Sequence, residues 1–274
     1  MIRVPWAKPL GEVCRDWLLE LARKDAEEGC PRVSRLKSDN AMYFMDLTKD
    51  WSVQQRGDLL CARVRWLFNK NYGHSQSELT EAERAAESHW DYPFFGRNLG
   101  TGPYRSPGKP GVEIARPSGR RTVVDADKAE SVHRLDRMEL GEFKIDKKRL
   151  KGAVKTAMLP AFGTPKVAGP LWQYITNVDG LTVSTRLDFG GRQPSQLRYH
   201  QWIHSIKDGK RVWLLDHGGI GSLLGSPRTE WRYLTDADIP EAANLLVQVC
   251  KEFVEAVPGL WARSGLTGLE GEPS

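Results

Sequence analysis

Three histidines and one aspartate in the last third of the chain have side chains that could carry acid/base or metal chemistry. They are His200, His204, His217 and Asp216. Alternate residues of a β-strand point to the same side, so a hairpin could bring the three imidazoles onto one face. His200 and His204 are two pleats apart, roughly 13 Å, which is too far for one metal ion. We therefore predict no metal site and name His200, His217 and Asp216 as candidate catalytic residues, with a histidine as the base and the aspartate orienting it.

A glycine-rich stretch begins at the third of these histidines. It runs His217-Gly218-Gly219-Ile220-Gly221-Ser222, and its start is similar to the oxyanion-hole loop of some esterases. The Gly-x-Ser-x-Gly elbow that presents the nucleophile in such enzymes is missing from the chain. The lysine of a phosphate-binding loop is missing too. The stretch is more typical of a flexible connection, and we predict no cofactor.

The chain is unusually rich in large aromatic residues, since it contains ten tryptophans. One group falls on predicted strands, where core packing is the usual role, and another lies in or beside a Gly/Pro-rich segment. Large aromatics in such a segment either anchor it or present a binding surface. From the two groups we predict these binding residues: Trp202, His204, Trp213, Trp90, Tyr92, Phe94, Phe95 and Tyr104.

Two Asp-Gly pairs predict an antiparallel meander over residues 171–217. Asp179-Gly180 and Asp208-Gly209 each separate runs of β-forming residues, and type I′ turns need positive φ at both central positions. The first turn predicts four pairs on one face, a candidate for the core: Val178–Leu181, Thr176–Val183, Tyr174–Thr185 and Trp172–Leu187. The second predicts Lys207–Lys210, His204–Trp213, Trp202–Leu215 and His200–His217. Both faces of the second hairpin carry apolar residues, so its buried face stays undecided.

Periodicity and breaker residues place the other elements. Predicted helices cover residues 9–24, about 50–70, 80–88, 146–159 and about 235–257. The third begins with a capping box of Thr80 and Glu83, and the fourth is capped by Asp146. Prolines at 160 and 258 are expected to end the last two. Predicted strands cover residues 41–47, 112–115 paired with 122–124, and 229–234.

This order of elements predicts an α+β protein. We expect a mainly helical N-terminal region over 1–90, an irregular Pro/Gly-rich junction over 91–127, an α+β domain over 128–262 and a flexible tail over 263–274. The N-terminal helices could form a core of their own or dock on the sheet. In the α+β domain, helices flank an antiparallel meander of four or five strands. Residues 144–261 thereby resemble the small α+β domains of bacterial toxin-immunity and other contact-dependent or defence proteins.

Composition narrows the classes of function. The chain is 40% apolar and 27% charged, has no apolar run of membrane-spanning length and begins without a secretory signal, so we expect a cytosolic protein with no membrane partner. Four dispersed cysteines without a Cys-x-x-Cys pair favour buried reduced thiols. The net charge of +5 is concentrated in residues 91–155, which hold fifteen Lys or Arg and nine Asp or Glu.

These observations favour a protein-binding module, of the immunity or defence type that the resemblance implies, because the aromatic complement is large and no catalytic set is complete. A hydrolase that uses His200 or His217 with Asp216 is one alternative. Nucleic-acid binding through the basic residues 97–155 is the other, and it is less favoured because that segment lacks a regular basic and aromatic stripe.

Overall fold

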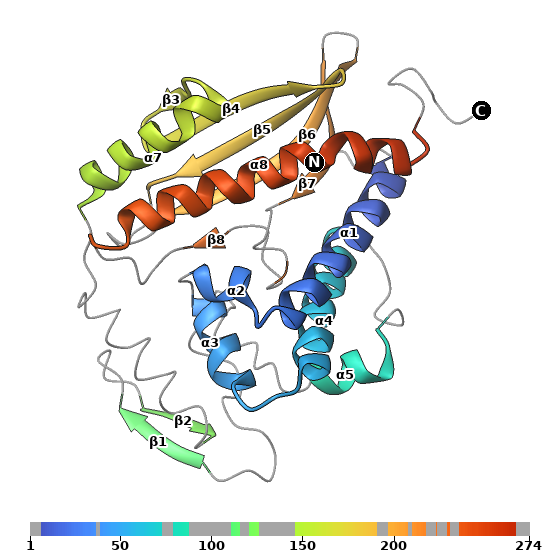
Figure 1. Cartoon of the computed structure of the whole chain (residues 1–274), viewed down its shortest axis with the longest axis vertical. Helices are drawn as coiled ribbons and strands as arrows, with labels where there is room; N and C mark the ends of the chain where they lie inside the picture. Colours follow the sequence, from blue (N-terminus) through green and yellow to red (C-terminus); the bar gives the residue numbers. More distant parts are fainter. Residues whose placement is uncertain are drawn as a thin grey trace.

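The chain folds into a helical N-terminal region and an antiparallel sheet covered by two helices, which confirms the α+β class (Figure 1). The computed structural model describes residues 7–36, 39–72, 79–87, 111–115, 121–125, 146–190, 197–207, 210–217, 223, 229–230 and 236–266.

The N-terminal region contains five helices in the described part of the chain. They are α1 (Ala7–Glu27), α2 (Pro31–Arg35), α3 (Asp39–Thr48), α4 (Val53–Tyr72) and α5 (Glu81–Glu87). The predicted capping box at the start of α5 is confirmed. The backbone N–H of Thr80 donates to Glu83 Oε2 (3.1 Å), and the N–H of Glu83 donates to Thr80 Oγ1 (3.1 Å).

Residues 41–47 were predicted as a strand, and this prediction is wrong because they form most of α3. A short apolar run satisfies both strand and helix patterns, so its length alone decides little. In the structure Ala41, Phe44 and Thr48 are buried at helical spacing. The Thr48 hydroxyl also donates to the Phe44 carbonyl (2.8 Å), a contact between successive turns.

The C-terminal part is built on a six-stranded antiparallel sheet. Its strands are β3 (Lys166–Ala168), β4 (Leu171–Val178), β5 (Leu181–Asp188), β6 (Arg198–Lys207), β7 (Lys210–His217) and β8 (Thr229–Glu230). They follow the order β3-β4-β5-β6-β7, and β8 pairs with β6. All four predicted pairs of the first hairpin are confirmed. Its turn has positive φ at Asp179 (49°) and Gly180 (79°), as a type I′ turn requires.

Two other strand predictions fall partly inside the described residues. The separate hairpin of β1 (Gly111–Ala115) and β2 (Arg121–Asp125) confirms the expected pairing near residues 112–124. Of the strand expected at 229–234, residues 229–230 form β8, and the rest lies outside the described residues.

Helices α7 (Lys147–Phe162) and α8 (Ile239–Arg263) lie along the sheet (Figure 1). Asp146 caps α7 as predicted, accepting the N–H of Lys148 at 2.8 Å. The predicted ends at Pro160 and Pro258 are wrong, since both prolines lie inside their helices. A proline inside a helix costs about 3 kcal/mol, and packing beyond it offsets that cost. The ring of Phe162 packs on Tyr174 (6.1 Å), and Leu260 is buried.

One hydrophobic core joins the N-terminal helices to the sheet and α8. Trp17 of α1 packs against Phe253 of α8, with ring centroids 6.2 Å apart. Arg32 of α2 donates to the Glu252 carboxylate of α8 at 2.6 Å. The N-terminal helices therefore dock on the C-terminal part, which was one of the two expected arrangements. The proposed domain boundaries stay a prediction.

Candidate protein-binding surface

The second hairpin confirms the predicted register near its turn and corrects it further away. Lys207 pairs with Lys210 and His204 with Trp213, as predicted. Ile203 then pairs with Leu215, so Leu214 is an extra residue on β7 that forms a β-bulge. Beyond the bulge the register moves by one residue, which exchanges the two faces of β7 relative to β6.

Two predicted pairs are therefore wrong. Trp202 lies opposite Asp216 rather than Leu215, and His217 lies opposite Gln201 rather than His200. The predicted face with three histidines is not formed, because His217 occupies the register position of the other face. The hydrolase alternative, which uses His200 or His217 with Asp216, stays a prediction; the observed register places Asp216 on the face of β6 that carries His200 and Trp202.

Helix α8 decides which face of the second hairpin is buried in the core. Gln201 Nε2 donates to Thr185 Oγ1 (3.0 Å) and to the backbone carbonyl of Cys250 in α8 (3.1 Å). Tyr199 and Ile203, on the same face of β6, are fully buried. The sequence left this face undecided because its pattern is mixed. The face predicted as core for the first hairpin, which includes Tyr174 and Val183, is confirmed.

The predicted binding residues Trp202 and His204 lie on the opposite face, and they are only 8% and 2% exposed. Gln173 Nε2 donates to Ser184 Oγ (3.2 Å), and this hydroxyl lies 3.5 Å from His204 Nδ1. The half-buried ring of His200 meets Trp202 edge-on, with centroids 5.3 Å apart. These side chains form a packed polar and aromatic layer, so the surface described below does not include them.

The side chains of several predicted site residues lie outside the described part of the structure. Trp90, Tyr92, Phe94, Phe95 and Tyr104 lie outside the described residues, as do the glycines after His217. Trp213, Asp216 and His217 have their backbones in β7 at the register positions given above. Within the described ranges, no group of three His, Cys, Asp or Glu side chains could hold a metal ion.

No helix in the part of the chain that the structure describes has both the length and the apolar character needed to cross a membrane.

A different surface gathers the exposed apolar side chains of the described residues. Four large hydrophobic side chains are exposed in the described structure, and three of them belong to neighbouring elements: Leu159 of α7 (50%), Val167 of β3 (62%) and Ile175 of β4 (38%). The fourth, Val53, begins α4. We call the first three, together with the exposed Lys148, Lys155 and Lys166, the edge surface.

The edge surface wraps around one margin of the sheet. Strand β3 pairs with residues 171–173 of β4 only, and in the described structure no strand lies beside residues 174–178 on that side. Val167 pairs with Trp172 and so shares its face, whereas Ile175 points to the other face. At the opposite margin of the sheet, strand β7 is in contact with helix α1.

Helix α7 flanks this margin and is held there by aromatic contacts. Phe162 packs on Tyr174, and Lys151 Nζ lies 5.5 Å above the centre of the Phe189 ring. Leu150, Val154 and Met158 are buried at four-residue spacing. Lys148, Lys155 and Leu159 fall on a separate face at helical spacing and are exposed.

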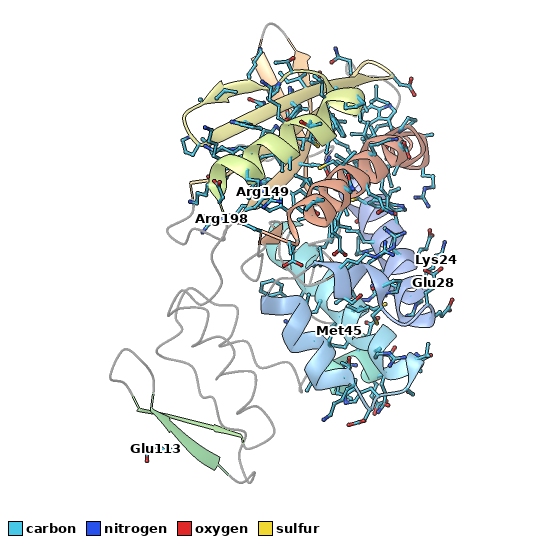
Figure 2. All side chains as sticks on the ribbon, turned by 60° about the vertical axis from the view of Figure 1, so that its left-hand side comes forward. Lys24, Glu28, Met45, Glu113, Arg149 and Arg198 are labelled. Atoms are coloured by element: carbon cyan, nitrogen blue, oxygen red, sulfur yellow. The ribbon has the colours of Figure 1, made fainter. Side chains whose placement is uncertain are left out.

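The charged residues in the segment from α7 to β4 are all basic. Residues 147–178 contain six Lys or Arg and no Asp or Glu. Arg149, at the N-terminal end of α7 in Figure 2, lies 4.0 Å from Asp236. Lys148, Lys155 and Lys166 form no ion pair with the described residues. Unpaired positive charge beside exposed apolar groups favours a partner with acidic and apolar side chains.

Sequence reasoning missed the edge surface, although two signals for it were present. One is the absence of acidic residues from 147–178. The charge count over residues 91–155 ends inside this segment and therefore does not show it. The other is Leu159, an apolar residue outside the buried stripe of α7. Strand β3 gave no such signal, since Lys-Val-Ala is too short to predict a strand.

Comparison of the chain with protein-family models, with curated proteins and with solved structures finds no match in any of the three.

Proposed function

We propose that this chain is a protein-binding module that recognises its partner through the edge surface. The observation that carries the proposal is that three of the four exposed large hydrophobic side chains in the described structure belong to α7, β3 and β4, the elements at one margin of the sheet. Single exposed hydrophobic residues are common on protein surfaces, but their concentration in one place indicates an interaction site.

We place this function in the cytosol and, by the resemblance of the helix, meander, helix order, among proteins of the immunity or defence type. Such a protein acts by occupying its partner, so it needs a complementary surface and no catalytic group. The exposed Lys166, next to Val167, and Lys155, one helical turn before Leu159, supply the polar rim that binding surfaces usually have.

The test compares two variants in which exposed apolar residues are replaced by aspartate. The double variant Leu159→Asp, Val167→Asp places charges in the edge surface, and Val53→Asp places one at the exposed hydrophobic residue of α4. Tagged proteins are purified from the native lysate, and the masses of their complexes are measured by light scattering. We expect a stoichiometric complex with the wild type and Val53→Asp, and its loss with the double variant.

Circular dichroism and urea unfolding show whether the variants keep the fold. A wild-type protein that is always a solitary monomer, or a folded double variant that keeps its complex, contradicts the proposed function.

Nucleic-acid binding keeps one observation in its favour, because the exposed basic helix α7 includes the end of the segment 97–155. Leu159 and Val167 beside it favour a protein partner, since apolar side chains gain little from a phosphate backbone. Binding to a nucleic acid would weaken steeply as salt is raised.

A further inference from the structure

We infer that the edge surface receives an extended acidic segment of the partner, which pairs as an additional strand with residues 175–178 of β4. This inference rests on the proposed function and specifies the chemistry of the partner. Three features of the described structure support it: an open strand edge, apolar side chains on both sides of that edge, and lysines without acidic partners.

The open edge provides backbone hydrogen-bonding groups. Alternate N–H and C=O groups of a strand point away from its paired neighbour, and β5 occupies only the inner side of β4. Natural sheets often protect such an edge with proline or with inward-pointing charge. Residues 175–178 read Ile-Thr-Asn-Val and contain neither. An extended peptide can therefore pair here by strand addition.

The apolar side chains define what the added strand should carry. Successive side chains of a strand point to opposite faces of a sheet. Val167 of β3 lies in line with the added strand on the face shared with Trp172, and Ile175 lies on the other face of β4. Apolar residues in the added segment would cover these side chains on both faces.

The lysines define its charge. Lys155 and Lys166 are exposed, lie on the two elements beside the open edge, and have no ion-pair partner in the described structure. A basic strand would be repelled by them, and a neutral one would leave their charge uncompensated. Carboxylates in the added segment satisfy both lysines, so the segment is acidic.

The probe is a fluorescein-labelled peptide, Glu-Val-Ile-Asp-Glu-Val-Ile-Glu, with blocked ends, which as a strand presents apolar and acidic residues on both faces. Its binding to the full chain is measured by fluorescence anisotropy. One comparison peptide has lysine in place of every acidic residue, and another has the same side chains with alternate backbone amides methylated. We expect the acidic peptide to bind, and both comparison peptides to bind at least about tenfold more weakly.

Two charge-reversed proteins test the location. Lys155→Glu with Lys166→Glu should weaken binding of the acidic peptide about tenfold, whereas Lys24→Glu with Lys49→Glu, at exposed lysines outside the edge surface, should leave it within about twofold. Hydrogen exchange of the peptide complex should show slower exchange at the amides of Ile175 and Asn177, which point away from β5.

Three results overturn the inference: no binding of the acidic peptide, equal binding of the methylated peptide, or tighter binding of a single-stranded thymidine oligonucleotide than of the peptide. The proposed function can survive this failure. If the native complex is still lost with Leu159→Asp, Val167→Asp, then the surface binds a protein by another chemistry. If that complex persists as well, both proposals fail.

Discussion

At the scale of single residues, Asp25 of α1 shows how burial and hydrogen bonding compete. Its carboxylate is fully buried and accepts the backbone N–H groups of Arg32 (2.8 Å) and Val33 (3.4 Å), at the start of α2. Burial raises the pKa of Asp25 from 3.8 to about 6, although these hydrogen bonds lower it. Its negative charge is therefore less stable in the folded protein than in the unfolded chain.

The raised pKa of Asp25 predicts a pH dependence of stability. Between about pH 4 and pH 6 the folded state binds this proton and the unfolded state has lost it, so rising pH favours unfolding. The contribution of Asp25 is fully present below pH 4. On the order of 3 kcal/mol is lost by the time the pH has passed through the folded pKa of about 6.

Asp25→Asn isolates this contribution, because its amide oxygen can accept the N–H of Arg32 without ionising. Urea unfolding, followed by tryptophan fluorescence at several pH values, gives the free energies of unfolding of both proteins. The wild type minus variant difference should fall as pH rises from 4 to 6 and then level off above about 7. A constant difference would contradict the assignment.

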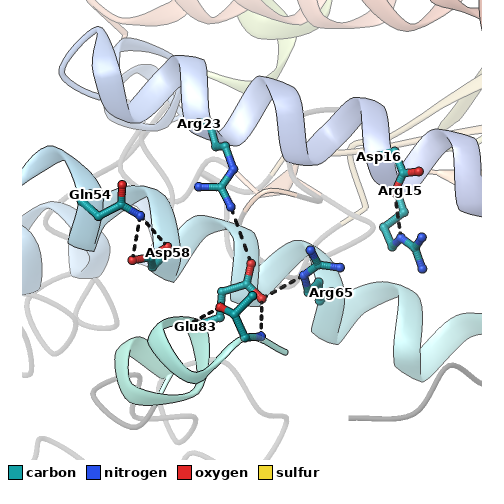
Figure 3. A network of polar contacts seen from close by, with 8 residues as sticks. Arg15, Asp16, Arg23, Gln54, Asp58, Arg65 and Glu83 are labelled. Carbon is teal, nitrogen blue, oxygen red and sulfur yellow. Dashed lines mark hydrogen bonds and ion pairs between the residues drawn. The ribbon is translucent and has the colours of Figure 1, made fainter. Parts of the chain in front are cut away.

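At the scale of elements, a network of charged side chains fixes α5 against α1 and α4 (Figure 3). Glu83 of α5 is fully buried. Its carboxylate lies 2.9 Å from Arg65 Nε of α4 and 3.9 Å from Arg23 Nη2 of α1, and it accepts the N–H of Thr80. A short helix gains little stability by itself, so these contacts hold α5 in place.

Two variants separate the capping bond from the charge of Glu83. Thr80→Ala removes one capping hydrogen bond and should cost about 1 kcal/mol of unfolding free energy. Glu83→Gln keeps an acceptor for the Thr80 N–H but removes the negative charge between the two arginines, which should cost about 2–3 kcal/mol. Urea unfolding measures both. The account is wrong if Thr80→Ala is the more harmful change.

At the scale of the whole molecule, the shared core implies that the two parts unfold together. Cys61 of α4 and Cys250 of α8 are both buried in that core. Burial raises the pKa of Cys61 to about 11, and it also raises the pKa of Cys250. Neither thiol should therefore react in the native protein at neutral pH.

Thiol labelling can test this joint unfolding. Two proteins are compared, one with Cys61 and one with Cys250 as the single cysteine, the others being replaced by alanine. Labelling after incubation at increasing urea concentrations should give the same midpoint for both. Reaction of Cys61 at clearly lower urea than Cys250 would show that the N-terminal helices unfold separately, as the predicted boundary near residue 91 would allow.

The prediction of the fold was accurate where a few neighbouring residues decide the conformation. Asp179-Gly180 accepts positive φ at both positions, and Thr80 with Glu83 satisfies the free N–H groups of a helix start. Failures came where distant packing competes with local preference. Pro258 did not end its helix, because the following turn places Leu260 in the core.

The same distinction between local and distant causes applies to the candidate site. By itself, the sequence determined the meander, the helix stripes and the excess of basic residues, because these depend on turn chemistry, periodicity and composition. Only the tertiary structure decided that Leu214 forms a bulge and that α8 covers the face of Gln201, which leaves Trp202 and His204 buried on the other side. It also decided that Leu159, Val167 and Ile175 are exposed on the elements at one margin of the sheet, because exposure depends on which elements pack beside one another.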